Sequence, residues 1–218
     1  MNRQAIEDYL KTIYELAEEE SPVSTTRVAE ARKVKASSAT NMMQKLARLE
    51  LVSYEKHRGV TLTAAGRAVA LETIRYHRLV ELYLTSELGF GWDEVHEEAD
   101  RLEHVLNEKL AERMAAVLGE PAFDPHGDPI PARDGSLETQ PTQLMSALQQ
   151  GMVATVSRVG DDTNVELLRY LDSLGIRPGT EIRLLETAPF EGPLTIAVGQ
   201  EEKIIGRRAA DTIHVQID

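Results

Sequence analysis

The pattern that most restricts the fold of this chain lies between residues 24 and 62. Ser24 is the predicted N-cap of a short helix, and after the tight connection ARKVKA, Ser37 or Ser38 can cap a second helix that runs to about Leu49. The stretch LVSYEKHRGVTLT then alternates between apolar and polar residues, and the glycine at its basic tip suits a hairpin turn. Helix, short turn, helix and basic hairpin, in this order, predict a winged helix-turn-helix.

The charge of this region is opposite in sign to that of the whole chain. The chain of 218 residues has a formal net charge of −12, whereas residues 27 to 67 hold nine Lys and Arg against three acidic residues. A basic segment in an acidic protein indicates an anionic partner. The alternative is a helical hairpin with polar ends, but order, spacing and charge together favour double-stranded DNA. The side chains expected to contact DNA are Arg27, Ser37, Ser38, Thr40, Asn41, Gln44, Lys45, Lys56 and Arg58.

Helical periodicity marks three further segments, at residues 3 to 20, about 63 to 88 and 93 to about 118. The sequence GFGW separates the last two. Their apolar stripes are wider than one pair of helices can bury, which predicts a homodimer.

The rest of the chain changes from helical to strand periodicity. The stretch GEPAFDPHGDPIPARDGS is rich in Pro, Gly and Asp and predicts a connector, in which His126 is expected to be a turn residue rather than a ligand. Five short strands are predicted after it, at MVATVSRV, EIRLLE, LTIAV, KIIG and TIHVQI, and they indicate a small SH3-like barrel. The expected fold class is therefore α+β and mainly α. It comprises a winged helix-turn-helix (1–73), a helical dimerisation domain with a Pro-rich linker (74–140) and an SH3-like domain (141–218).

Composition excludes several classes of protein. The chain has no cysteine, which rules out disulfides, thiolate metal sites and cysteine nucleophiles. There is no apolar run long enough for a transmembrane helix, and the first residues lack the core of a signal peptide. We therefore expect a cytoplasmic protein without membrane contact.

The stretch HEEADRLEHV is the densest cluster of side chains that can bind a metal. His96, Asp100, Glu103 and His104 recur three or four residues apart and would share one face of a helix. Imidazole and carboxylate groups together can hold a divalent cation, and oxygen-rich sets suit harder ions such as Mn²⁺. Taken alone, the stretch is more typical of an ordinary solvated helix face than of a ligand set.

The ordered set of motifs resembles the diphtheria toxin repressor family, the bacterial metal-dependent regulators of iron and manganese uptake. The resemblance is carried by EDYLKTIYEL, SSATNMMQKLARLELV, YEKHRGVTLTAAG, RYHRLVELYL, VHEEADRLEHVL and DPHGDPIP, and it extends over nearly the whole chain. It implies that the helical domain also binds metal and that the C-terminal domain is FeoA-like. The implied primary metal ligands are Asp8, Asp100, Glu103 and His104. The implied second site uses His77, Glu81 and His96 with an acidic residue of the barrel, for which Asp162 is preferred over Asp161 and Glu166.

The resemblance also bears on the choice of metal. Iron-responsive members carry sulfur ligands at the positions of Asp8 and Asp100, whereas the manganese-responsive branch has carboxylates there. Lys11 departs from that branch, which can place a further acidic ligand at this position. The sequence therefore predicts a homodimeric, Mn²⁺-activated repressor of metal-uptake genes that binds palindromic operators and is not an enzyme. The alternatives are an Fe²⁺-dependent repressor of the same architecture, a metal-dependent hydrolase and a non-regulatory scaffold.

Overall fold

The computed structural model describes residues 3–217, and the chain divides into two compact units. The N-terminal unit comprises Met1–His77, Glu103–Leu106 and Pro131–Ser136. The C-terminal unit comprises Arg78–Leu102, Asn107–Ile130 and Leu137–Asp218. Helix α4 (Ala64–Leu88) begins in the first unit and ends in the second. Within residues 3–217, no helix is long and apolar enough to cross a membrane.

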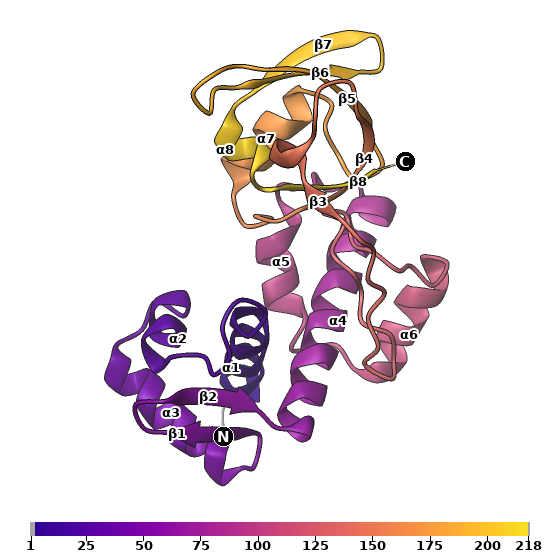
Figure 1. The fold of residues 1–218 in the computed structure, drawn as a ribbon. Coiled ribbons are helices and arrows are strands. Elements are labelled where there is room, and N and C mark those ends of the chain that lie inside the picture. The colour runs from indigo at the N-terminus through magenta and orange to yellow at the C-terminus, as the bar shows by residue number, and fades with distance from the viewer. Residues whose placement is uncertain (1–2, 218) are drawn as a thin grey trace. The chain divides into compact units, whose positions relative to one another are not determined.

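The N-terminal unit is a winged helix-turn-helix, as predicted. It contains the helices α1 (Arg3–Leu16), α2 (Thr25–Ala31) and α3 (Ala36–Arg48), followed by the strands β1 (Val52–Glu55) and β2 (Gly59–Leu62) (Figure 1). The two strands pair antiparallel and form the wing. Apolar side chains from all three helices and from β2 form the core, and the fully buried ones include Leu10, Ile13, Val28, Met43, Leu46 and Val60.

Two helix boundaries in this unit differ from the sequence prediction. Helix α1 ends at Leu16 instead of near residue 20. Helix α3 begins directly after Lys35, whose side chain makes no capping hydrogen bond. Ser37 and Ser38 therefore lie inside the helix as exposed residues and not at its cap. By contrast, the predicted cap Ser24 is confirmed, because its hydroxyl accepts a hydrogen bond from the Arg27 amide at 3.2 Å.

The C-terminal unit contains two helices where the sequence predicted a single one. Helix α5 (Val95–Leu102) is followed by five non-helical residues and a new helix, α6 (Glu108–Val117). Asn107 caps α6, because its side-chain oxygen accepts a hydrogen bond from the Leu110 amide at 3.0 Å. The non-helical residues include Glu103 and His104, which belong to the N-terminal unit. The prediction of one continuous helix is therefore wrong, and the break determines where these two ligand candidates lie.

The chain ends in an antiparallel sheet with the strand order β3-β8-β4-β5-β6-β7. The strands are β3 (Gln143–Leu144), β4 (Val153–Val159), β5 (Glu181–Thr187), β6 (Leu194–Val198), β7 (Glu201–Ile205) and β8 (Ile213–Ile217). The 3₁₀ turn η1 (Met145–Ala147) and the helices α7 (Val165–Ser173) and α8 (Arg207–Ala210) complete this part (Figure 1). All five predicted strands are present and β3 is additional, so the predicted α+β fold class is confirmed.

Candidate metal centres and nucleic-acid interface

The second helix of the helix-turn-helix, α3, presents a polar surface. Six α3 side chains were predicted to contact DNA. Four of them are exposed, namely Ser37, Ser38, Asn41 and Gln44. The other two, Thr40 and Lys45, are half-buried. The Thr40 hydroxyl donates to the Ala36 carbonyl at 2.9 Å and is engaged within the helix. The exposed amides and hydroxyls can form hydrogen bonds with base edges or phosphates.

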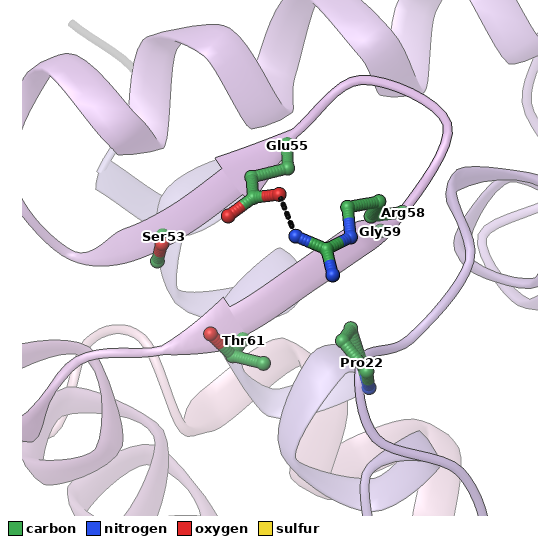
Figure 2. Close-up of a pocket in the computed structure, with 6 residues that line it drawn as sticks. All are labelled: Pro22, Ser53, Glu55, Arg58, Gly59 and Thr61. Carbon is green, nitrogen blue, oxygen red and sulfur yellow. Dashed lines mark hydrogen bonds and ion pairs between the residues drawn. The ribbon is translucent and has the colours of Figure 1, made fainter.

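The wing carries two exposed cations, Arg58 and Lys56, of which Arg58 is paired with an exposed acid. Figure 2 shows Arg58 reaching toward Glu55 across the hairpin, with Arg58 Nη1 2.8 Å from Glu55 Oε2. Gly59 follows directly, and a Cβ there would lie 2.5 Å from the Val23 carbonyl oxygen, so the turn requires glycine. Lys56 is exposed beside it. Exposed ion pairs contribute little to stability, so a phosphate can replace Glu55 as the partner of Arg58.

Arg27 is the one predicted DNA contact in α2. Its guanidinium pairs with Glu19 at 2.7 Å and Glu20 at 3.4 Å, and the partners are exposed. As at the wing, these surface pairs leave the guanidinium available to an incoming phosphate.

Asp8, Glu103 and His104 come together in the N-terminal unit and form what we call the first cluster. Nε2 of His104 lies 3.0 Å from Asp8 Oδ1 and 3.3 Å from Glu103 Oε1. The other ring nitrogen, Nδ1, lies 2.8 Å from Oε2 of Glu7. Asp8 and Glu7 come from α1, whereas Glu103 and His104 come from the break between α5 and α6. Ligand atoms of Asp8, Glu103 and His104 lie within 4.8 Å of one another, as metal ligands do.

Two cations border the first cluster. Nζ of Lys11 lies 2.9 Å from Glu103 Oε2 and 2.9 Å from Nδ1 of His77. Arg32 Nη2 lies 2.7 Å from Asp8 Oδ2. Burial by itself would raise the pKa of Glu103, but the hydrogen bond with His77 and the charge of Lys11 outweigh burial and hold that pKa below its usual value. Glu103 is therefore an anion, the form that binds a metal.

Sequence reasoning missed Glu7. Its carboxylate is buried, although it stands on α1 among the apolar side chains Ile6, Leu10 and Ile13 that face the core. A charged residue on the apolar face of an amphipathic helix is the signal that could have identified it.

A second group of ligand candidates lies in the C-terminal unit around Glu81, which is fully buried. Oε1 of Glu81 lies 3.3 Å from Nδ1 of His96, and Asp162 Oδ2 lies 4.0 Å from the same nitrogen. Burial raises the pKa of Asp162, and the Glu81 charge raises it further. The structure thus brings together three of the four residues expected at the second site. The fourth, His77, lies in the N-terminal unit beside Lys11 and Glu103.

Asp100 was expected among the primary ligands, and the structure places it on α5 in the C-terminal unit. Its Oδ2 lies 3.8 Å from Nε2 of His96, and its side chain is about half exposed. Its assignment to the first cluster stays a prediction.

The other carboxylate oxygen of Glu81 faces two residues of the connector, Asp124 and His126. Oε2 of Glu81 lies 3.8 Å from His126 Nδ1, and ligand atoms of the three residues lie within 4.8 Å of one another. All three are buried. Among the described residues, Asp124 Oδ2 and His126 Nδ1 reach no hydrogen-bond partner. Asp124 Oδ2 also lies 3.7 Å from Nε of Arg78, beyond hydrogen-bond distance. Buried polar atoms that lack hydrogen bonds and converge on one point fit a bound cation. We call these three residues, with His96 and Asp162, the second cluster.

The connector is shaped to hold these two side chains. The other oxygen of Asp124, Oδ1, accepts hydrogen bonds from the amides of His126 at 2.8 Å and Asp128 at 3.0 Å. At Gly127, which has a φ of +89°, a Cβ would lie 1.9 Å from the Ser157 carbonyl oxygen, so only glycine permits this close approach to β4. His126 does lie in a turn, as predicted, but its side chain points into the second cluster. The composition of the connector concealed that role.

Trp92, the single tryptophan of the chain, covers His126. The two rings are stacked with centroids 5.7 Å apart, and the guanidinium of Arg177 lies 5.2 Å from the Trp92 ring on the barrel side. Nε2 of His126 donates to the Trp92 carbonyl at 2.7 Å. That hydrogen bond places a proton on Nε2, which leaves Nδ1 as the nitrogen able to bind a metal.

Electrostatics in the second cluster favour the uptake of positive charge. Burial, with the charges of Asp128 and Glu81, raises the pKa of Asp124 to about 8. Burial lowers the pKa of His126, but the carboxylates of Glu81 and Asp124 outweigh it and raise that pKa to about 9. Protons held in this way are the ones that a divalent cation displaces when it binds.

Comparison with known proteins agrees with this architecture. Three domain families match the chain. Residues 2–60 match the iron dependent repressor, N-terminal DNA binding domain, and residues 63–132 match the iron dependent repressor, metal binding and dimerisation domain. Residues 144–217 match the FeoA domain. The chain is 34% identical to the diphtheria toxin repressor of Corynebacterium jeikeium over 203 residues, which cover 83% of this chain and 85% of that protein. The chain belongs to the diphtheria toxin repressor family.

Members of the diphtheria toxin repressor family similar to this chain are named for different metals. The iron-dependent repressor IdeR of Mycobacterium leprae is 32% identical over 223 residues and 96% of each chain. A manganese-dependent transcriptional repressor solved in complex with manganese is 41% identical, with a TM-score of 0.87 over 98% of this chain and 100% of that chain. The manganese regulator SloR is 34% identical, with a TM-score of 0.75 over 98% of each chain. The protein is thus a metal-dependent DNA-binding repressor, and the prediction that it is not an enzyme is confirmed.

Proposed function

We propose that the protein is a manganese-activated repressor of metal-uptake genes, which acts in the cytoplasm as a homodimer on palindromic operators. The observation that carries this proposal is the donor chemistry of the two clusters, which offer only carboxylate oxygens and imidazole nitrogens. Oxygen-rich sets of this kind suit Mn²⁺ better than the softer metals that sulfur ligands select. The names of the manganese-dependent relatives support the same choice.

In the first cluster, Asp8, Glu103 and His104 would hold the metal, with Asp100 as a further proposed ligand. A bound metal supplies positive charge between groups that otherwise repel one another. Lys11 already neutralises the second oxygen of Glu103, at 2.9 Å. Glu103 therefore offers its other oxygen, Oε1, to the first cluster. This arrangement favours a single metal ion there.

In the second cluster, Glu81, His96, Asp162, Asp124 and His126 would hold the metal, and His77 stays a proposed ligand. Asp124 Oδ2 and His126 Nδ1, which reach no hydrogen-bond partner among the described residues, support this assignment. The hydrogen bond between His126 and the Trp92 carbonyl keeps the metal-binding nitrogen directed into the cluster.

The path from metal to DNA starts in the first cluster. Glu103 and His104 lie in the chain segment between α5 and α6, whereas Asp8 lies on α1, which packs against the helix-turn-helix. Metal would therefore fix this segment to α1. A ligand that binds one arrangement of α1 more tightly than the others shifts the population toward it. DNA affinity rises with metal if that arrangement matches the spacing of two operator half-sites.

Dimerisation is proposed to use the helical part of the C-terminal unit. Several large apolar side chains there are exposed, at Leu88, Phe90, Leu102, Leu110 and Val117. Exposed apolar groups in such number are typical of an interface between copies. The match of residues 63–132 to a metal binding and dimerisation domain supports this use, and the proposed domain division remains 1–73, 74–140 and 141–218.

The test is metal-titrated DNA binding under anaerobic conditions, with a duplex recovered by in vitro selection. We expect Mn²⁺ to raise affinity at least as well as Fe²⁺. His104→Ala should abolish activation by both metals, because it removes the nitrogen that lies between Asp8 and Glu103. His57→Ala at the exposed wing tip is the control and should leave the ratio of metal-loaded to metal-free affinity unchanged. Activation by Fe²⁺ with Mn²⁺ bound but inert would favour the second candidate, an iron-dependent repressor like IdeR.

A further inference from the structure

Arg32 joins the first cluster to the turn that precedes α3. It is the residue directly after α2 and the first of the connection to α3, and its amide donates to the Val28 carbonyl at 3.0 Å. Its side chain leaves this turn and pairs with Asp8 on α1, with Nη2 2.7 Å from Oδ2. The other oxygen of the same carboxylate, Oδ1, lies 3.0 Å from His104 Nε2. One carboxylate therefore contacts both the helix-turn-helix and the first cluster.

The Arg32 side chain is held in this position more firmly than that of Arg58 in the wing. Its guanidinium lies 5.6 Å from the centroid of the buried Tyr9 ring. Its partner Asp8 is largely buried, with 19% of the side chain exposed. The acid paired with Arg58 is 60% exposed. Charge-assisted hydrogen bonds shielded from water are stronger than surface pairs, so Arg32 stays with Asp8 while Arg58 is free to exchange partners.

We infer that Arg32 is a positioning residue that couples metal occupancy of the first cluster to the turn before α3. The inference rests on the proposed function of that cluster. With Oδ2 held by Arg32, Asp8 presents Oδ1 alone to the metal, which fixes the orientation of the carboxylate. A metal held by Oδ1 would in turn fix Oδ2, and with it the guanidinium and the backbone of the turn. Linkage makes the coupling reciprocal: if metal strengthens DNA binding through Arg32, DNA strengthens metal binding by the same factor.

The experiment measures DNA affinity of the full chain with and without Mn²⁺, on a duplex recovered by in vitro selection. The ratio of the two affinities is the coupling, which is typically about 5- to 150-fold in allosteric proteins. Arg32→Gln should reduce this ratio to within about threefold of one, while Mn²⁺ still binds the first cluster. Arg32→Lys keeps the charge but loses the planar guanidinium, and it should also lose most of the ratio. If Arg32 acted only by contacting phosphate, lysine could replace it, and Arg32→Lys would keep the wild-type ratio.

Arg27→Gln is the matched control, because it removes one positive charge from α2 at a residue that contacts Glu19 and Glu20 but not Asp8. It should weaken DNA binding equally in both states and leave the ratio intact. Hydrogen exchange provides a second measurement: Mn²⁺ should protect the amides of residues 33–36 in the wild type but not in Arg32→Gln.

The inference is overturned if Arg32→Gln or Arg32→Lys retains the wild-type ratio, or if residues 33–36 gain the same protection in the variant. A wild-type ratio of one would instead refute the proposed function. The two failures are therefore distinguishable.

Discussion

Asp124→Asn should stabilise the metal-free protein while weakening metal binding in the second cluster. The change keeps the side-chain oxygen that accepts hydrogen bonds from the amides of His126 and Asp128, so the shape of the connector is preserved. It removes only the negative charge of the carboxylate, which burial and the neighbouring charges of Asp128 and Glu81 make unfavourable.

The magnitude follows from the pKa of Asp124, which folding raises from 3.8 to about 8. Between these two values the folded state holds a proton that the unfolded state has lost, so the free energy of unfolding falls as the pH rises. At about 1.36 kcal/mol for each pKa unit, the penalty is on the order of 4 kcal/mol at pH 7 and about 2 kcal/mol at pH 5. Below pH 4 both states are protonated and the penalty disappears. Asparagine carries no such penalty, so the gain in stability should increase with pH and level off above about 8.

The assay is urea unfolding in the presence of EDTA, followed by the fluorescence of Trp92, which is the only tryptophan and lies in the C-terminal unit. Asp211→Asn is the control. It disrupts an exposed pair with Arg207 at 3.6 Å and should change stability by less than about 1 kcal/mol. An Asp124→Asn protein that is no more stable than the wild type at pH 8, or a gain that does not change with pH, would refute the electrostatic argument.

Three further predictions concern metal, DNA and assembly. Mn²⁺ should change the fluorescence emission of Trp92, because that ring is stacked on His126, and His126→Ala should remove the response. A wild-type protein whose emission does not respond to Mn²⁺ would argue against metal in the second cluster. Arg58→Ala should weaken binding to all DNA sequences and lower the slope of log affinity against log salt by about one, and an unchanged slope would show that the wing does not contact phosphate. Leu110→Glu places a charge at an apolar residue that is 47% exposed, and it should convert dimers to monomers in sedimentation, whereas a stable wild-type monomer at micromolar concentration would contradict the proposed interface.

The N-terminal fold could be predicted because its signals are local. Helical periodicity, the Ser24 cap and the basic hairpin tip each depend on residues close in sequence, and the structure reproduces them. The strands of the barrel were predictable for the same reason, since alternation and turn residues mark each one.

The break between α5 and α6 could not be predicted from periodicity, because HEEADRLEHV keeps helical spacing through Val105. The only local signal was Asn107, and asparagine occurs inside helices as well as at caps. The role of Asp124 and His126 was equally hidden, since the connector has the composition of an ordinary turn. Only the fold shows that Glu81, from α4, faces both of them. Ligand sets assembled from distant segments are visible only once the topology is known.

The N-terminal unit is discontinuous, because it takes residues 103–106 and 131–136 from beyond the end of its main segment. This has a consequence for synthesis on the ribosome. The helix-turn-helix can fold once residue 77 has emerged, but its first cluster lacks Glu103 and His104 until some thirty residues later. A nascent or truncated chain that stops in this interval would carry the DNA-contacting helix without the metal ligands that regulate it. Because metal is proposed to activate DNA binding through the first cluster, such a chain could not be switched on, and repression would have to wait for residues 103 and 104.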